Sequence, residues 1–412
     1  MTKNILTRVN EVYSEKTPSK YFDDEDLIPR FVENATNFLL KLKIPPRAFL
    51  NSTLIDFGCG TGQKTLVYDQ LGASCTLIEY DKKSIEIAKK YFSKYAKNPF
   101  RFINSDLFSA KVEKASYDFV LSSGVAHHTS DPLKNLQICC DSVKNGGMLI
   151  FGITNKAGFF QRHLQRLILF SISENKEEIV KYSKILFKES LERSMRHGGR
   201  DIEAIIWDTF LNPKIYSFGT KQIIECLESN GLELYSTYRD LKIAQEILQP
   251  SNLYHKNMQD PNGNTPAFKN NNELIYLSDF EDISKSNNKT FNQKIVDDLH
   301  ELLPFFNAIT DGINDLSFDQ HKVNFNELIT NVRNYKRMIG NFQKIDILDK
   351  HHNENFFNEV YDIFHILNKD KSKSNKFLEI KKAIENSEHL FHKFNGVGMN
   401  YYCGYKKLKP LK

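Results

Sequence analysis

Residues 53–62 constrain the possible fold of this chain more than any other stretch. The apolar run Thr53–Ile55 ends at an acid, Asp56. Glycines follow at alternate positions, 58, 60 and 62, and the next segment, Gln63–Gln70, is able to form a helix. This order predicts a buried parallel strand that turns sharply into a helix. Glycines allow the turn unusual backbone angles, and the free N–H groups of the helix start can then face a ligand.

The spacing of the glycines separates two classes of cofactor. A dinucleotide-binding loop has the pattern G-x-G-x-x-G, but Gln63 stands where its last glycine should be. This weakens an interpretation as an NAD-dependent oxidoreductase. The pattern D-x-G-x-G-x-G instead resembles the first motif of the class I S-adenosylmethionine-dependent methyltransferases. The resemblance implies S-adenosyl-L-methionine as cofactor, with Asp56 facing its ammonium group and these loop residues around it: Gly58, Cys59, Gly60, Thr61 and Gly62.

Further candidate cofactor residues follow at the predicted strand ends. Glu79 ends a short buried strand about twenty residues beyond the loop, where a carboxylate can accept hydrogen bonds from both ribose hydroxyls. The resemblance assigns this role to Glu79 and lets Tyr80 pack against the adenine. It also implies that Asp106 and Leu107, after the third strand, contact the adenine. An Asp is, however, common in turns for local reasons, so Asp106 has a second explanation. Ser122, near the end of the fourth strand, completes the predicted cofactor site.

Two adjacent histidines, His127 and His128, follow the fourth predicted strand. The next residues, Asp131 and Pro132, have a local explanation as N-cap and first helical residue, but the histidines have none. A similar stretch is common in class I methyltransferases that act on small molecules. Either histidine could take a proton from an acceptor hydroxyl or amine near neutral pH. Orientation of the loop or cofactor by hydrogen bonds explains them equally well, and the lack of a third ligand at a recognisable spacing disfavours zinc.

Strand and helix patterns alternate from residue 51 to residue 155, which predicts a parallel sheet independently of the resemblance. The expected fold class is α/β: a Rossmann-like, doubly wound, mostly parallel seven-stranded sheet with a large additional helical segment. We expect a helical lead-in covering the cofactor cleft, a methyltransferase domain, a helical insertion or accessory domain, and a last sheet strand with a basic tail. Their ranges are 1–50, 51–240, 241–395 and 396–412.

The seventh strand separates two interpretations of the C-terminal half. Residues 396–406 are aromatic, punctuated by glycine and strand-like, whereas residues 241–395 hold loop-rich stretches and helical patterns. If the terminal stretch is the missing strand, residues 241–395 are one insertion that emerges beside the active-site edge. The rival interpretation is a separate C-terminal helical domain with a local terminal hairpin.

The stretch after the fifth strand is locally basic. Its cations could bind an acidic group such as a phosphate or a carboxylate, but a solvated helix face is the favoured interpretation. The basic residues are Arg162, His163, Arg166, Arg193, Arg196, His197 and Arg200.

Composition narrows the class of partner. The net charge of +5 is too mild to indicate nucleic acid, although the terminal lysines lean weakly toward RNA. A cytoplasmic protein without a membrane span is expected, because apolar runs stay short, the N-terminus lacks a signal segment and the cysteines lack metal spacing. We expect methyl transfer to an O or N atom of a small-molecule or glycan acceptor. The alternatives are RNA or protein methylation, or a catalytically silent S-adenosylmethionine-binding module that recruits a protein partner through its helical segment.

Overall fold

A computed structural model describes residues 25–156, 158–198, 201–238, 293–314, 316, 323–341, 350–370, 372–391 and 398–408. The start of the predicted lead-in, the loop-rich part of the predicted insertion and the end of the basic tail lie outside these ranges. Within them, no helix is both long and apolar enough to cross a bilayer.

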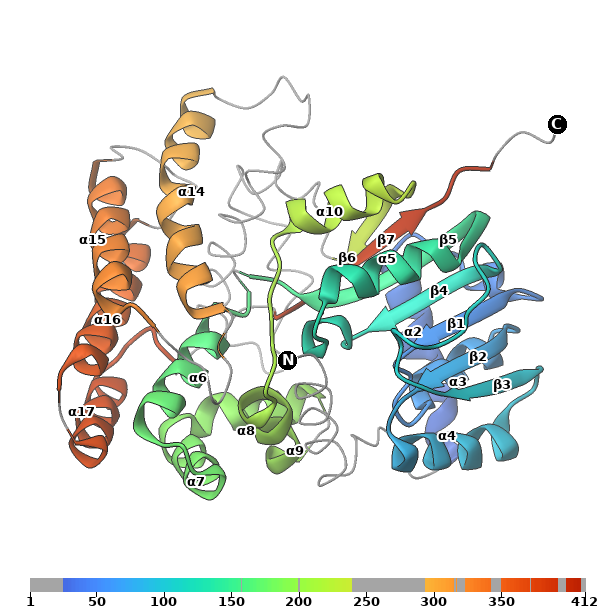
Figure 1. Ribbon diagram of the computed structural model, residues 1–412, viewed down its shortest axis with the longest axis horizontal. Helices are drawn as coiled ribbons and strands as arrows, with labels where there is room; N and C mark the ends of the chain where they lie inside the picture. Colours follow the sequence, from blue (N-terminus) through green and yellow to red (C-terminus); the bar gives the residue numbers. More distant parts are fainter. Residues whose placement is uncertain are drawn as a thin grey trace.

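A seven-stranded sheet forms one half of the molecule, on the right in Figure 1. Its order is β3-β2-β1-β4-β5-β7-β6. All neighbours from β3 to β5 pair in parallel, and β7 is antiparallel to both β5 and β6. The predicted Rossmann-like class is confirmed. The strands are β1 (Thr53–Phe57), β2 (Ser74–Glu79), β3 (Phe100–Asn104), β4 (Tyr117–Ser123), β5 (Val143–Thr154), β6 (Glu233–Tyr238) and β7 (Met399–Tyr405).

Helices cover both faces of the sheet, as a doubly wound fold requires. One face carries α5 (Pro132–Ser142) and α10 (Thr220–Ser229), and the other carries α2 (Ile28–Lys41), α3 (Gln63–Gln70) and α4 (Lys82–Tyr95). The N-cap predicted at Asp131 is present, and the acid before the preceding helix, Asp81, which its position also predicts as an N-cap, acts in the same way. Both carboxylates accept hydrogen bonds from the main chain of their helices, α5 and α4. These caps fix where both helices begin at the carboxyl edge of the sheet.

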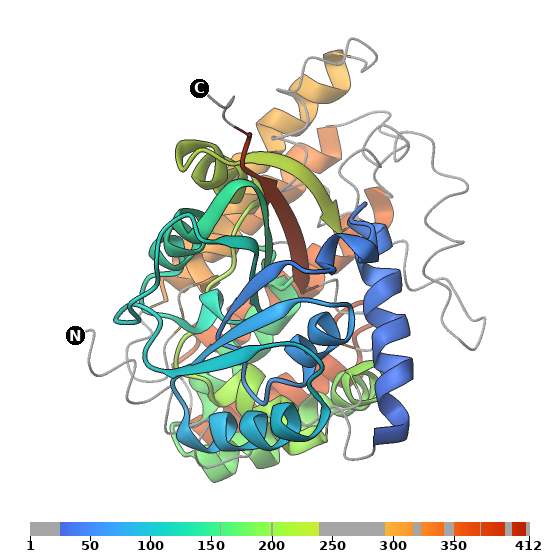
Figure 2. The same cartoon turned by 90° about the vertical axis from the view of Figure 1, so that its right-hand side faces the viewer.

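The last described strand enters the middle of the antiparallel edge. β7 lies between β5 and β6, although about 160 residues separate it from β6 in sequence (Figure 2). A Cβ atom on Gly152 would lie 2.6 Å from the Tyr401 ring, so glycine is needed where β7 crosses β5. The predicted seventh strand is confirmed, and the rival local hairpin is wrong because β7 pairs with two strands remote in sequence. The domain boundary at residue 395 stays a prediction.

The junction between α5 and β5 differs from the expectation. Asn145, Gly146 and Gly147 predict the end of a helix, followed by a strand from Met148 to Ile153, but α5 ends at Ser142 and β5 starts at Val143. Val143 is buried and pairs with Tyr117 across the sheet. Burial of this one β-branched residue starts the strand early, and the glycines then fall inside it.

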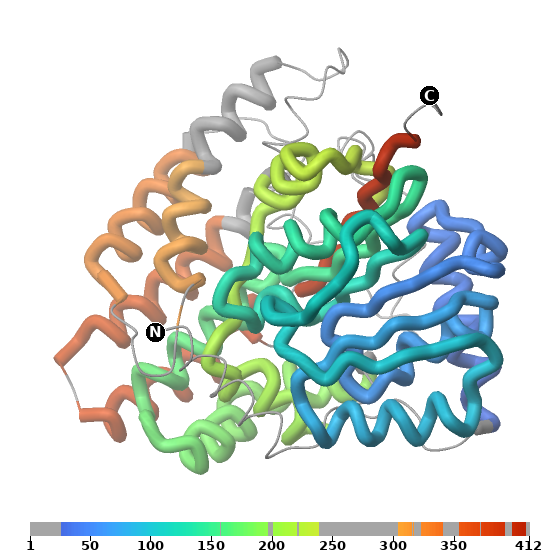
Figure 3. Tube along the Cα trace, turned by 45° about the vertical axis from the view of Figure 1, so that its right-hand side comes forward, coloured from blue at the N-terminus to red at the C-terminus, as the bar shows by residue number. Residues whose placement is uncertain are grey.

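Two stretches of chain far apart in sequence form a helical body beside the sheet (Figures 1 and 3). The first holds α6 (Phe160–Ile172), α7 (Lys176–Leu186), α8 (Lys188–Gly198), α9 (Ile202–Ile206) and the π-helix η4 (Trp207–Leu211). The second holds α14 (Gln293–Asn314), α15 (Phe325–Asn341), α16 (Lys350–Asn368) and α17 (Lys373–Glu385). We refer to these nine elements together as the helical body.

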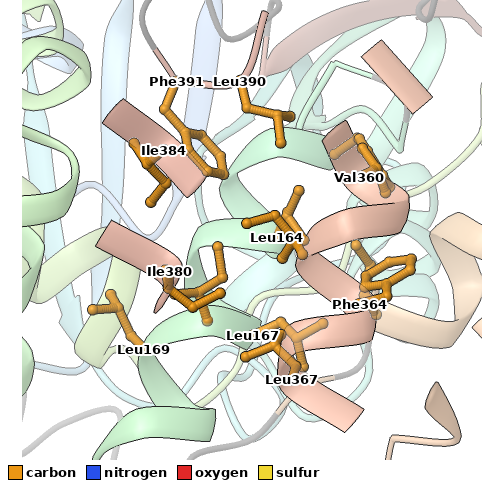
Figure 4. Packing of buried hydrophobic residues seen from close by; sticks show 14 of the residues in the cluster. Leu164, Leu167, Leu169, Val360, Phe364, Leu367, Ile380, Ile384, Leu390 and Phe391 are labelled. Carbon is orange, nitrogen blue, oxygen red and sulfur yellow. The ribbon is translucent and has the colours of Figure 1, made fainter. Parts of the chain in front are cut away.

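One hydrophobic core holds the helical body together. Figure 4 shows Leu164 and Leu167 of α6 packed among Val360 and Phe364 of α16, with Ile380 of α17 beside them. Each such fully buried side chain contributes about 1.5–3 kcal/mol of hydrophobic free energy. The helices of the predicted insertion therefore share their core with α6 to η4 and do not enclose a separate one.

Candidate active site

The glycine loop after β1 has the geometry of a ligand cradle. Gly58, Gly60 and Gly62 have φ angles of +79°, +55° and +71°, which side chains other than glycine rarely adopt. A Cβ on Gly60 would meet no atom within 4 Å, so this glycine borders open space. A Cβ on Gly58 would lie 2.6 Å from Val125, two residues before the histidine pair. The loop thus borders open space at Gly60 and packs against the histidine segment at Gly58.

The carboxyl group of Asp56 is buried at the end of β1. It accepts a hydrogen bond of 2.5 Å from the Thr65 hydroxyl of α3. Burial raises the pKa of Asp56 to about 6, from an ordinary value of 3.8. A buried carboxylate with a raised pKa favours a cationic ligand, because the cation offsets the cost of desolvation. This observation fits the ammonium group of S-adenosylmethionine.

Glu79 ends β2 and is bound by main-chain amides. Its Oε2 accepts from Gly60 N, and its Oε1 accepts from Tyr80 N and Asp81 N, each at 2.8 Å. Burial raises the pKa of Glu79, and these amide hydrogen bonds lower it again. A carboxylate offers roughly four acceptor positions, so about one is left for a ribose hydroxyl. Glu79 ties the open part of the glycine loop to β2, and its predicted double contact to ribose stays a prediction.

The other predicted cofactor residues surround this edge at different depths. Tyr80 is 45% exposed, and Asp106 is half-buried and accepts a hydrogen bond from the Ser109 hydroxyl. Leu107 packs against the core cluster of the β4–β5 face. Ser122 is fully buried, and its contact to a cofactor stays a prediction. In the loop itself, Cys59 N donates to Ile78 O and the Thr61 hydroxyl donates to the Gln63 side chain.

His127 and His128 lie in a short 3-10 helix (Ala126–His128) at the carboxyl end of β4. Their ring centroids are 4.1 Å apart, and both side chains are buried. His127 is 4% exposed, and its Nδ1 has no hydrogen-bond partner among the described residues. Burial lowers the pKa of His127 well below its usual range. This imidazole is therefore neutral at physiological pH.

His128 is held from both ring nitrogens. Its Nδ1 lies 2.9 Å from Lys214 O, and because a carbonyl can only accept, this nitrogen carries a proton. Its Nε2 lies 3.5 Å from an Asp208 carboxylate oxygen on η4. The structure thus separates two histidines that the sequence left equivalent, since His128 is anchored and His127 is not.

Besides the contact of Asp208 with His128, the helical body reaches the histidine segment through the backbone of residues 216 and 217. His127 O accepts from Tyr216 N, and the next residue, Ser217, is gripped by Asn314 at the end of α14. Asn314 accepts from Ser217 N and donates to Ser217 O, both at 2.8 Å. The Ser217 hydroxyl also lies 2.9 Å from Nε2 of His163 on α6. The end of α14 therefore helps to position the main chain of His127.

Sequence reasoning missed the residues that support the histidines, namely Asp208, Ser217 and Asn314. Their partners all lie between 54 and 97 residues away in sequence, so no local spacing reveals them. The π-helix η4 is a structural signal of the kind often found at functional sites, but it is visible only in the fold.

The favoured interpretation of the basic stretch as a solvated face is wrong for α6. Arg166 and His163 are buried and Arg162 is half-buried, because α6 is covered by η4, α14 and α17. Arg196 on α8 is exposed, as a solvated face requires. Arg200 and the side chain of His197 lie outside the described residues.

Comparison with known proteins finds methyltransferases that are similar to the sheet half of the chain. Residues 55–151 match a family model described as a methyltransferase domain. A ubiquinone biosynthesis O-methyltransferase of Nitrosospira multiformis is 26% identical over 172 residues, which are 40% of this chain and 70% of that protein. The human mitochondrial ubiquinone biosynthesis O-methyltransferase is 27% identical over 170 residues, 39% of this chain and 45% of that protein.

Solved structures with a local likeness include a magnesium protoporphyrin IX methyltransferase from Synechocystis with bound S-adenosylhomocysteine. It has a TM-score of 0.32 and 16% identity, and covers 57% of this chain and 87% of that one. A putative S-adenosylmethionine-dependent methyltransferase from Listeria monocytogenes has a TM-score of 0.27 and 21% identity, and covers 31% of this chain and 57% of that one.

Proposed function

We propose that this chain is a class I S-adenosylmethionine-dependent methyltransferase that methylates an oxygen atom of a small-molecule acceptor. The observation that supports the proposal most directly is the neutral, unanchored imidazole of His127 at the carboxyl edge of β4. The relatives at 24–30% identity are named as O-methyltransferases, which agrees with a hydroxyl acceptor. A hydroxyl must lose its proton as it attacks, so a base is useful there.

We propose that the glycine loop and the two acids hold the cofactor. Asp56 would face its ammonium group, and the open side of Gly60 would lie against its main body. Glu79 would keep Gly60 in place and offer its remaining acceptor position to the ribose. Bound S-adenosylmethionine supplies a methyl group already activated by a sulfonium.

His127 is proposed as the general base. In the neutral form, one of its ring nitrogens can accept the proton of the acceptor hydroxyl as the oxygen attacks the methyl carbon. The proton then resides on His127 and leaves to solvent after transfer. Burial that keeps the ring neutral also excludes water, and alignment of the acceptor supplies much of the acceleration.

His128 and Asp208 are proposed as positioning residues. The bonds from His128 to Lys214 O and to Asp208 tie the 3-10 helix to η4. This arrangement holds the neighbouring His127 ring, 4.1 Å away, in a fixed place. Loss of the Asp208 contact should therefore lower turnover without changing cofactor affinity.

The test is to incubate the full chain with methyl-labelled S-adenosylmethionine and a set of small phenols and alcohols, then with a fractionated cell extract. Transfer of label to a small hydroxyl compound, lost in His127→Ala, is the expected result. Label on RNA, protein or a glycan instead would select the corresponding alternative. Cofactor binding without any transfer would overturn the proposal and leave a binding module.

A further inference from the structure

The hydroxyl group of Tyr401 on β7 reaches across β5 to the carboxyl end of β4. In the register of the sheet, Ser123 of β4 pairs with Gly152 of β5, and Gly152 pairs with Tyr401. Because Gly152 has no side chain, the Tyr401 ring can lie over β5, where a Cβ on Gly152 would be 2.6 Å from the ring. The Tyr401 hydroxyl oxygen then lies 3.1 Å from Ser123 Oγ. We refer to these two groups as the hydroxyl pair.

Aromatic side chains of α2 and β6 fix the Tyr401 ring. The ring centroids of Phe38 and Tyr401 are 4.7 Å apart, and the two rings meet edge to face. The Tyr238 ring centroid lies 6.3 Å from that of Tyr401 and 5.5 Å from that of Phe38. Edge-to-face contacts of this kind favour one ring orientation over others. Ser123 and Tyr401 are only half-buried, so the fold fixes the hydroxyl pair without enclosing it completely.

The hydroxyl pair has one hydrogen-bond donor that no described residue accepts. Each hydroxyl carries a single O–H group, and one of the two is used in the bond between Ser123 and Tyr401. Among the residues that the structure describes, the second O–H has no acceptor. A donor held in a half-buried position is complementary to a ligand that presents an oxygen acceptor, because leaving such a donor unpaired costs free energy.

The hydroxyl pair lies close to Asp56, the acid proposed to face the ammonium group of the cofactor. Asp56 pairs with Leu121, and Ser123 comes two residues later on the same face of β4. Strand spacing and the rise along a strand place the Cα atoms of Asp56 and Ser123 about 8 Å apart. Tyr68 of α3 lies between the two groups: burial raises the pKa of its hydroxyl, and the nearby Asp56 and Tyr401 side chains raise it further.

The ends of these strands are also in direct contact above the hydroxyl pair. A Cβ on Gly58 of the glycine loop would lie 2.6 Å from Val125, which follows β4. A Cβ on Gly124 would lie 3.5 Å from the methyl group of Met399, the first residue of β7. The glycine loop, the end of β4 and the start of β7 therefore border one part of the carboxyl edge.

An amino-acid group matches this arrangement of an acid beside a hydroxyl donor. In the amino-acid end of S-adenosylmethionine, the ammonium and carboxylate groups are bonded to the same carbon, so a site that binds one group has the other next to it. Asp56 complements the ammonium group, but an acid would repel the carboxylate. A fixed O–H donor complements the carboxylate, because a hydrogen bond to a charged acceptor is about twice as strong as a neutral one.

We propose that the Tyr401 hydroxyl, held by Ser123, donates a hydrogen bond to the carboxylate of the cofactor's amino-acid end. In the bound form, Ser123 donates to the Tyr401 oxygen, and the Tyr401 O–H is directed to the carboxylate. The inference rests on the proposed function for the identity of the cofactor. It adds one residue from the last strand to a site whose other contacts come from segments close in sequence.

Calorimetry of the full chain with three ligands tests the proposal. S-adenosylmethionine carries both charged groups, decarboxylated S-adenosylmethionine lacks the carboxylate, and methylthioadenosine lacks the whole amino-acid end. We expect Tyr401→Phe to bind S-adenosylmethionine about tenfold to hundredfold more weakly than the wild type, because a charge-assisted hydrogen bond is lost while the ring remains. The other two ligands should bind the wild type and Tyr401→Phe equally.

Tyr402→Phe is the matched control. Tyr402 follows Tyr401 on β7 but faces the opposite side of the sheet, where its hydroxyl lies 2.9 Å from the Thr220 hydroxyl. This variant loses a hydrogen bond of the same kind and should keep its affinity for all three ligands. Ser123→Ala should weaken S-adenosylmethionine binding less than Tyr401→Phe. The double variant should bind no more weakly than Tyr401→Phe alone, because Ser123 acts through Tyr401.

The outcomes separate this inference from the proposed activity. Equal affinity of the wild type and Tyr401→Phe for S-adenosylmethionine would overturn the inference alone. An equal loss for all three ligands would also overturn it, because it would mean that Tyr401 has only a structural role. If Tyr401→Phe does not fold, Ser123→Ala decides by the same pattern of ligands. The expected pattern without methyl transfer to any acceptor would sink the proposed activity and leave the inference standing. No binding of S-adenosylmethionine to the wild type would overturn both.

Discussion

The proposed cofactor site around Asp56 and Glu79, here called the cofactor edge, and the proposed acceptor site around His127 and His128, here called the acceptor edge, are built from contacts of very different range in sequence. At the cofactor edge, Thr65 binds Asp56 across nine residues and Gly60 binds Glu79 across 19. At the acceptor edge, Lys214 O lies 86 residues from His128, and Ser217 and Asn314 are 97 apart. The cofactor edge is held by hydrogen bonds between residues close in sequence. The acceptor edge forms only after distant segments have packed, so the two edges should respond differently to mutation.

Removal of the last strand should have the largest effect. A fragment of residues 1–240 lacks β7 and leaves the facing edges of β5 and β6 unpaired. It also lacks α14 to α17, so the shared core with α6 is exposed. We expect an aggregated or noncooperative fragment by circular dichroism and no cofactor binding by calorimetry. A fragment of residues 1–408 keeps β7 and serves as the control, and a soluble 1–240 fragment with full cofactor affinity would contradict the interdependence of the two regions.

Substitution of His127 should affect turnover more than any single change at the cofactor edge. We expect His127→Ala to lower kcat by about 10²–10⁴-fold with cofactor affinity unchanged, because a positioned base is lost. The readout is the rate of label transfer together with calorimetry of S-adenosylmethionine. His365→Ala, on α16 within the helical body, is the matched control. Equal losses in both variants would reduce His127 to a packing role.

Substitution of Asp56 should weaken cofactor binding and stabilise the free protein. Its pKa of about 6 in the folded state exceeds 3.8, so folding favours the protonated carboxyl. Stability therefore falls as pH rises from about 4 to about 6, and above that the buried charge costs on the order of 2–3 kcal/mol. Asp56→Asn should remove this pH dependence in thermal unfolding and weaken S-adenosylmethionine binding roughly tenfold to hundredfold at pH 7.

The wild-type protein gives a further check on Asp56. Its cofactor affinity should fall about tenfold per pH unit below pH 6, because the protonated carboxyl no longer attracts the ammonium group. Unchanged affinity in both Asp56→Asn and Glu79→Ala would overturn the assignment of the cofactor edge. Asp118→Asn, at the opposite end of the sheet and paired with Lys144, is the control for general charge loss.

Asn314 connects the two regions, and its substitution should have the smallest effect. Asn314→Ala removes both hydrogen bonds to Ser217 and should cost about 1–3 kcal/mol of unfolding free energy. We expect kcat to fall several-fold because the His127 backbone loses support, with cofactor affinity unchanged. The exposed Asn326 on α15 is the control, since Asn326→Ala should change stability by less than about 0.5 kcal/mol. A fall in cofactor affinity with kcat unchanged would contradict this prediction, because it would mean that α14 supports the cofactor edge and not the acceptor edge.

The elements that the sequence predicted well are those whose contacts are local. The glycine loop, the caps at Asp81 and Asp131, and the strands from β1 to β4 follow from apolar periodicity and turn chemistry over a few residues. The last strand was also predictable, because an aromatic, glycine-punctuated stretch followed a fold that lacked one strand. No local pattern shows that it pairs with β5 and β6, because both strands are remote in sequence.

The parts that the sequence predicted poorly depend on packing between distant segments. The basic pattern on α6 is typical of a solvated face, but η4 and α14 cover it and bury Arg166. Likewise, nothing near His127 and His128 in sequence distinguishes them, since Asp208, Lys214 and Tyr216 come from beyond the fifth strand.

By itself, the sequence determined the strand–loop–helix unit at Asp56–Gly62, the class of cofactor and the sheet that carries them. The reason is that backbone angles, caps and strand burial are set by neighbouring residues. Only the tertiary structure decided that both ring nitrogens of His128 have partners while Nδ1 of the buried His127 has none among the described residues, and that the basic face of α6 is covered. Burial and charge compensation depend on which remote segments pack together. In this protein, contacts between such segments form the proposed acceptor edge.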